Sequence, residues 1–413
     1  METSDLLKEK VKVKTLIANT LDSLSLFSYF MVVISRILLF SSISGYMPTL
    51  SSILKYSAIF FIVVINIIYL VGYPKTWRQF FFIVMGYTLA LIEMYTNGLQ
   101  NNFSMAIILG ISLIGINCTF RRLAFIQGLG MLTGSLIIVL LSFWGALPQT
   151  GFASRVYSFQ SSYQETVYYY GFNHPNAFGT VITMGIILLS LGKGTSKKTF
   201  AILLAGCVAL DFVAGADTAM MAAFFMLLGV ILTPFREKLY RVGYFVTNFL
   251  LLFLPLLSIW LGINANTSIG QWVSRIIAAR PPIWNYYLTL NPIKLIATPP
   301  QLDFSVGNNV VGNGVLDGSY IYALVYWGIL ALIVILLSWK AWIPFEKHPT
   351  SFQWMILLFV FAVTVMSFPE SHMLSYYENM LILGFGLFQF NSNKRKLLIN
   401  EWQFEKEHHE NIN

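Results

Sequence analysis

Residues 54–73 read LKYSAIFFIVVINIIYLVGY, an apolar run that carries a single charge, Lys55. A membrane-spanning helix needs about 20 mostly apolar residues, so this run is long enough to cross a bilayer. Similar runs recur along the chain. The sequence therefore predicts an all-α, polytopic membrane protein with about twelve transmembrane helices, at 22–44, 54–73, 79–96, 102–119, 123–146, 174–192, 199–215, 217–235, 242–262, 318–338, 352–368 and 374–390.

The composition excludes a soluble protein. Of 413 residues, 56% are hydrophobic and 11% are charged, whereas a soluble domain carries about 25% charged residues. Cys118 and Cys207 both fall within predicted spans, so no disulfide framework is expected. We predict one transmembrane domain over 22–390, with a cytoplasmic amino-terminal segment at 1–21 and a cytoplasmic tail at 391–413.

The net charge of +8 fits a membrane protein better than a nucleic-acid-binding one. If the amino terminus is cytoplasmic and the spans alternate, twenty of the 26 basic residues lie inside, which is the positive-inside pattern. Two basic residues, Arg36 and Lys55, fall within spans. Arg36 should have a partner there, and the candidates are Asp211, Asp217 and Glu93. The basic residues predicted to lie outside are Arg155, Arg275, Arg280 and Lys294.

Two predicted outer loops, 147–173 and 263–317, are too long to be simple connectors. We expect a short interfacial helix at 269–280 in the second loop, stopped by the two prolines that follow it. Outer arginines suggest an anionic ligand, because the guanidinium fork binds phosphate oxygens in pairs. The alternatives are anchoring to lipid headgroups and local ion pairs. No phosphate-binding loop, dinucleotide fingerprint or Asp-x-Asp pair occurs in the sequence.

Four short motifs resemble those of the bacterial oligosaccharide repeat-unit polymerases, within the O-antigen polymerase and ligase superfamily. The likeness covers residues 120–390 and depends on the order of the motifs. They are GFNHPN at 171–176, Arg280 with Trp284, Leu316-Asp317 with Tyr320 and Gly328, and Pro369-Glu370 with Asn379.

The chain departs from the family pattern at two places. Many relatives carry an arginine just before the Gly-Phe segment, where this chain has three tyrosines at 168–170, and Arg155 lies further upstream. Many also have Ser-Arg-Thr where this chain reads Ala216-Asp217-Thr218. The number of catalytic arginines therefore stays open.

The resemblance implies a metal-independent glycosyltransferase of the GT-C-like architecture, without a cofactor, in the bacterial cell membrane. It would join polyprenyl-diphosphate-linked repeat units, such as those on undecaprenyl diphosphate, at the outer face of the membrane. The product would be a capsule, an exopolysaccharide or an O-antigen. Expected partners are these lipid-linked oligosaccharides, membrane lipids, a flippase and a chain-length regulator, and no nucleic acid. An O-antigen-type ligase and a lipid-linked oligosaccharide flippase or transporter remain the alternatives.

Under this resemblance, Arg280 and Arg275 are expected to clamp the diphosphate, and His174 to act as the general base. Glu370 and Asp317 are rival bases. His174 and Asp317 are also candidates for helix capping, and Trp284 for an interfacial aromatic. The residues expected to bind substrate are Arg155, Asn176, Trp284, Asp317, Tyr320 and Glu370.

Overall fold

The computed structural model describes residues 2–72, 75–97, 118–158, 161–298, 300, 316–343, 345–390 and 399, and these are mostly helical. Five helical stretches are long and apolar enough to cross a membrane, which supports a multi-pass membrane protein. The predicted span at 102–119 falls almost entirely outside the described residues. The five stretches are Asn19–Leu39 of α1 (Glu2–Leu39), α3 (Pro48–Gly72), α6 (Phe120–Phe143), α7 (Pro175–Lys193) and Thr233–Ile263, which joins η2 (Thr233–Phe235) to α10 (Arg236–Ile263).

Other predicted spans are shorter or divided. Helices α9 (Asp217–Ile231), α14 (Ile329–Lys340) and α15 (Ser351–Met366) are apolar but short. The segment predicted at 374–390 forms 3₁₀ turns rather than an α-helix. Other helices, besides two described below, are α2 (Ile43–Tyr46), α4 (Trp77–Asn97), α8 (Lys197–Ala214), α13 (Ser319–Tyr326), η4 (His372–Leu374) and η5 (Met380–Gln389).

The predicted span at 318–338 is interrupted between α13 and α14. Gly328 has a φ of +94°, which only glycine adopts easily. The N–H groups of Ile329 and Leu330 donate to the carbonyl oxygens of Lys294 and Leu295, at 3.0 and 3.1 Å. The segment that contains Lys294 and Leu295 therefore satisfies the backbone donors that the break would otherwise leave without a partner.

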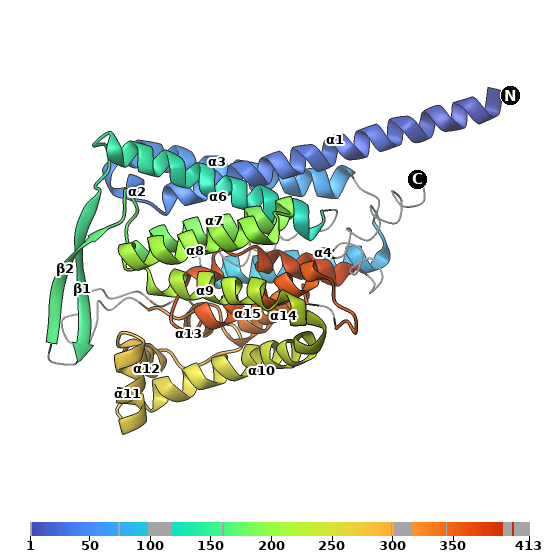
Figure 1. Ribbon diagram of the computed structural model, residues 1–413. Helices are drawn as coiled ribbons and strands as arrows, with labels where there is room; N and C mark the ends of the chain where they lie inside the picture. Colours follow the sequence, from blue (N-terminus) through green and yellow to red (C-terminus); the bar gives the residue numbers. More distant parts are fainter. Residues whose placement is uncertain are drawn as a thin grey trace.

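The outer loop predicted at 147–173 contains a β-hairpin that an all-α reading did not anticipate. Strand β1 (Thr150–Ser158) pairs antiparallel with β2 (Ser161–Tyr168), and Thr150 lies opposite Tyr168. Figure 1 shows the hairpin projecting from one end of the helix bundle, where α2, α11 (Ser268–Ile276) and α12 (Arg280–Leu290) also lie. The amino terminus of α1 lies at the opposite end.

The helix expected at 269–280 is also corrected. It ends at Ile276, and a second helix, α12, begins at Arg280 with Pro281 and Pro282 in its first turn. Proline is well tolerated there, because the first N–H groups of a helix have no partner within it. The two prolines therefore do more than end the helix that precedes them. They also form part of the first turn of α12, which begins at Arg280.

Close packing of α6 against α7 depends on small residues. A Cβ atom added to Gly128 would lie 2.4 Å from the backbone nitrogen of Leu189 on α7, far closer than real contacts allow. A Cβ atom on Gly192 would lie 2.3 Å from the backbone nitrogen of Phe125. Glycines thus let the two backbones approach, as is common between membrane helices. This contact lies near the carboxyl end of α7, and it fixes the axis of the helix that begins where the GFNHPN segment ends.

Gly128→Ala should therefore destabilise the protein by about 1–3 kcal/mol, the usual cost of overpacking. Its matched control is Gly206→Ala on α8, because a Cβ atom there would meet nothing within 4 Å. The thermal unfolding midpoint of the purified protein in detergent measures both variants. Equal midpoints for the two variants would contradict the close packing of α6 and α7.

Candidate functional site

Arg280, Asp317 and Glu370 form an ion cluster at the end of the bundle that carries the hairpin. Arg280 Nη2 lies 3.0 Å from Asp317 Oδ2 and 3.7 Å from Glu370 Oε1. The side chains of Arg280 and Asp317 are each 18% exposed and that of Glu370 is 5% exposed. A ligand could therefore reach the arginine and the aspartate, while the glutamate lies behind them.

The turn before α12 aims Arg280 at this cluster. Ala278 and Ala279 have φ values of 47° and 60°, a left-handed conformation that is unusual for alanine and often found at functional sites. Arg280 Nη1 donates to Ala278 O at 3.2 Å, and Nε donates to Pro369 O at 3.3 Å. The guanidinium is therefore held from three sides, by its own turn, by Asp317 and by the turn after α15.

Trp284 and the backbone around Asp317 complete this frame. Trp284 is buried on α12, one turn after Arg280, and its Nε1 donates to Asp317 O at 2.6 Å. The hydroxyl of Ser371 donates to Asp317 Oδ1 at 3.1 Å. Trp284 is therefore a buried side chain that donates a hydrogen bond. It is not exposed at the protein surface, where an interfacial aromatic would lie.

Glu370 collects hydrogen bonds from several helices. Its Oε1 accepts from Asn176 Nδ2 on α7 and from Thr218 Oγ1 on α9, both at 2.9 Å. Its backbone oxygen accepts from Ser319 Oγ on α13 at 2.6 Å. The carboxylate is therefore fixed in orientation by residues that are far apart in the sequence. Thr218 belongs to the Ala-Asp-Thr segment that departs from the family pattern.

A second acid and a histidine lie behind Glu370. His372 Nε2 is 3.8 Å from Glu370 Oε2, and His372 Nδ1 is 3.9 Å from Glu378 Oε2. The Glu378 side chain is fully buried. Sequence reasoning assigned no role to either residue, although the spacing Glu-x-His after Pro369 is visible in the chain.

The pKa values of Glu370 and His372, both in the turn after α15, move upward for different reasons. Burial and the nearby Asp317 carboxylate raise the pKa of Glu370, against opposing effects of Arg280, His372 and Thr218. Burial alone would lower the pKa of His372. The carboxylates of Glu378, Glu370 and Asp317 outweigh that effect and raise it. Both groups thus bind protons more tightly than in water, as groups that exchange protons near neutral pH often do.

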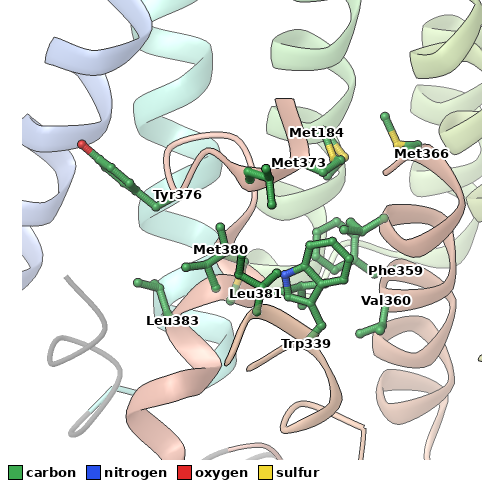
Figure 2. Close-up of a cluster of buried hydrophobic side chains, with 14 of the residues drawn as sticks. Met184, Trp339, Phe359, Val360, Met366, Met373, Tyr376, Met380, Leu381 and Leu383 are labelled. Carbon is green, nitrogen blue, oxygen red and sulfur yellow. The ribbon is translucent and has the colours of Figure 1, made fainter. Parts of the chain in front are cut away.

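Apolar side chains surround the inner side of this turn. Figure 2 shows Met373, the residue after His372, beside Met184 of α7 and Met366 of α15, with Trp339 of α14 and Leu381 of η5 nearby. All five side chains are buried. An apolar surround strengthens the electrostatic interactions of the ion cluster, because it lowers the local dielectric constant.

His174 caps α7 in this structure. Its Nδ1 accepts the backbone N–H of Asn176 at 3.1 Å. A neutral imidazole has one nitrogen with a free lone pair, so a histidine that caps through Nδ1 carries its proton on Nε2. In that state His174 donates rather than accepts at Nε2. This geometry favours the capping interpretation over the general base.

His174→Asn should therefore keep most of the protein's activity, because asparagine is also a good N-cap. His174→Ala should lower the stability by about 1 kcal/mol through loss of the cap. Activity and unfolding midpoints of the two variants, measured side by side, check this. An asparagine variant that folds normally but loses activity by orders of magnitude would restore His174 as the base.

Comparisons with protein-family models, with curated proteins and with solved structures gave no match. The family likeness therefore depends on the motifs alone. The order of the motifs in the sequence does not require them to lie close together in the fold. Their positions in the structure therefore add a second observation to the likeness.

Two other predicted site residues, Arg275 and Arg155, lie on α11 and β1. Arg275 is exposed in the last turn of α11 and makes no ion pair with another described residue. Arg155 lies in β1 opposite Tyr163, and β1 contacts α11.

Tyr320 is buried and Arg36 is half-buried, and both make contacts that involve neighbouring helices or turns. The buried Tyr320 hydroxyl donates to Thr364 O at 2.7 Å and so joins α13 to α15. Arg36 of α1 lies over the ring of Tyr376, 5.9 Å from its centroid. Asp211, one of the partners predicted for Arg36, instead accepts a hydrogen bond from Thr183 at 2.7 Å. The side chain of Glu93 lies outside the described residues.

Proposed function

We propose that the protein is a glycosyltransferase that polymerises lipid-linked oligosaccharide repeat units at the outer face of a bacterial cell membrane. One observation carries this proposal. The four segments of the family likeness, at 171–176, 280–284, 316–320 and 369–370, meet around the ion cluster, and each contributes a side chain or backbone atom to it. Motifs that only defined helix ends would have no reason to converge on one charged site.

The proposed chemistry assigns one task to each charged group. Arg280 stabilises the diphosphate of the carrier lipid as it leaves, because its planar donors match phosphate oxygens. Asp317 keeps the guanidinium oriented. Glu370 accepts the proton of the acceptor hydroxyl, since its pKa is raised and hydrogen bonds from Asn176 and Thr218 fix its carboxylate.

Charge balance gives the site a further requirement. Two carboxylates face the single guanidinium of Arg280, so a diphosphate needs additional positive charge nearby. In the proposal the helix and strand that carry Arg275 and Arg155 supply this charge, since α11 and the hairpin lie at the same end as α12 (Figure 1). These arginines would contact the donor only when it is bound.

Deleting the gene in a producing bacterium tests the proposal. A polymerase defect leaves single repeat units on the carrier lipid at the outer face, and complementation restores long chains. Unattached long polymer would instead identify a ligase. Unextended units that stay at the cytoplasmic face would identify a flippase. Either of these two results would contradict a polymerase.

A further inference from the structure

We infer that His372 and Glu378 form a positioning pair behind Glu370, in which His372 receives the proton that Glu370 takes from the acceptor and Glu378 balances the resulting imidazolium. This inference rests on the proposed function, because it assigns the path of the proton in that reaction. It adds two residues that the family likeness did not contain.

The placement of His372 carries the first part of the inference. Its two ring nitrogens face different carboxylates, with Nε2 3.8 Å from Glu370 Oε2 and Nδ1 3.9 Å from Glu378 Oε2. Proton transfer requires about 2.6–3.2 Å or one bridging water. A shift of about an ångström, or a single water on each side, therefore completes a continuous path from Glu370 to Glu378.

The burial of Glu378 carries the second part. Its side chain is fully buried, and among the described residues only weak interactions with the Ser375 hydroxyl and with His372 offset its charge. Burying a carboxylate without partners is strongly unfavourable, and an apolar side chain would fill the same space at lower cost. An acid at this position is explained if its charge stabilises the His372 imidazolium.

The other charged and titratable groups around the pair are few. Asp317 and Arg280 lie on the side of Glu370, and the hydroxyl of Ser375 lies beside Glu378. The ring of Phe40 on α1 packs edge-on against His372, with centroids 5.0 Å apart. Tyr377 neighbours Glu378. Figure 2 shows Tyr376 pointing away from Met373 and Met184. The guanidinium of Arg36 lies over the Tyr376 ring.

The proton balance of the step is simple. The acceptor O–H bond breaks as its oxygen forms the bond to the anomeric carbon of the donor. The electron pair of the broken carbon–oxygen bond leaves with the polyprenyl diphosphate. The proton passes to the Glu370 carboxylate and then to His372 Nε2, and later returns to solvent through the 20%-exposed face of the imidazole.

Histidine NMR of the full-length protein in lipid nanodiscs tests the pair without any substrate. The chain has five histidines, and His372→Gln identifies the resonance by its absence. We expect His372 to titrate above the ordinary pKa of about 6.5, and Glu378→Gln to lower its midpoint by about one pH unit or more, the effect of one nearby charge. Glu237→Gln, at an exposed glutamate, should leave it unchanged. A wild-type midpoint at or below the ordinary value, or one that Glu378→Gln does not move, would overturn the inference.

The pH profile of elongation gives a second readout, with lipid-linked repeat units extracted from the deletion strain as the probe. An imidazole that is already protonated cannot accept a proton at Nε2, so the acid limb of kcat/KM should report the ionisation of His372. His372→Gln should therefore lower kcat and shift the acid limb by removing that ionisation. His348→Gln, at an exposed histidine, is the matched control. An unmoved acid limb would contradict the role of His372. If the wild-type protein elongates nothing, the proposed function fails, and the NMR result still decides whether the pair exists.

Discussion

Replacing Arg280 with alanine is expected to lower elongation of lipid-linked repeat units by about 10²–10³-fold, the usual effect of removing one preorganised electrostatic donor. Arg280 is the only arginine that the structure places in contact with both Asp317 and Glu370 among the described residues. Without it, the leaving diphosphate would face two carboxylates. Arg280→Lys should recover only part of the rate, because lysine keeps the charge but lacks the planar fork.

Folding must be separated from catalysis in this test. Arg280→Ala leaves Asp317 and Glu370 without the arginine that neutralises them, and breaking a fully buried ion pair in this way would cost about 3–5 kcal/mol. The Arg280–Asp317 pair is partly exposed, so the loss of stability should be smaller. The double variant Arg280→Ala with Asp317→Asn restores the charge balance and should recover stability but not activity. Arg241→Ala, at an exposed arginine on α10, is the control for the loss of a basic side chain. Normal elongation by a folded Arg280→Ala protein would remove Arg280 from the mechanism.

Glu370→Gln is expected to lower elongation by about 10²–10⁴-fold, the range for loss of a general base. Glutamine has nearly the same shape, and its carbonyl oxygen can still accept from Asn176 and Thr218. The substitution therefore removes the basic group while keeping most of the packing. Initial rates of elongation at fixed pH, together with an unfolding midpoint close to that of the wild type, provide the measurement.

Asp317→Asn and Glu237→Gln are the matched comparisons for Glu370→Gln. Asp317 orients Arg280 in this account, so its loss should be milder than that of Glu370. Glu237 is exposed at the beginning of α10 and should have no effect. If Asp317→Asn were the more damaging of the two, Asp317 would be the better candidate for the base.

The membrane class and most helix positions could be predicted from the sequence, because long apolar runs have few other stable environments. The hairpin at 150–168 could not, since alternating apolar and polar residues in a loop of this length do not show whether a strand finds a partner. The break at Gly328 depends on carbonyl groups of Lys294 and Leu295 that lie in another segment. Tertiary contacts of this kind leave no local signal.

The site was predicted in part. Arg280, Asp317, Asn176, Trp284 and Glu370 were singled out by motif, and the structure places them in contact with one another. The hydrogen-bond partners of these residues could not be predicted, because they are far away in the sequence. Asn176 and Glu370 are 194 residues apart, and Thr218 and Glu370 are 152 residues apart.

The role of a site residue depends on its hydrogen-bond partners, which the sequence does not reveal. His174 was predicted as a base from its residue type, whereas its Nδ1 is engaged in capping α7. Conversely, His372 and Glu378 belong to none of the motifs of the family likeness. Only the turn after α15 brings them behind Glu370.

The proposed reaction joins one lipid-linked saccharide to another and releases the carrier diphosphate. Purified protein in liposomes, supplied with repeat units extracted from the deletion strain, tests this reaction without other proteins. We expect a ladder of longer lipid-linked glycans, with one polyprenyl diphosphate released for each new linkage. Folded protein that leaves these units unextended, or only moves them across the bilayer, would contradict it.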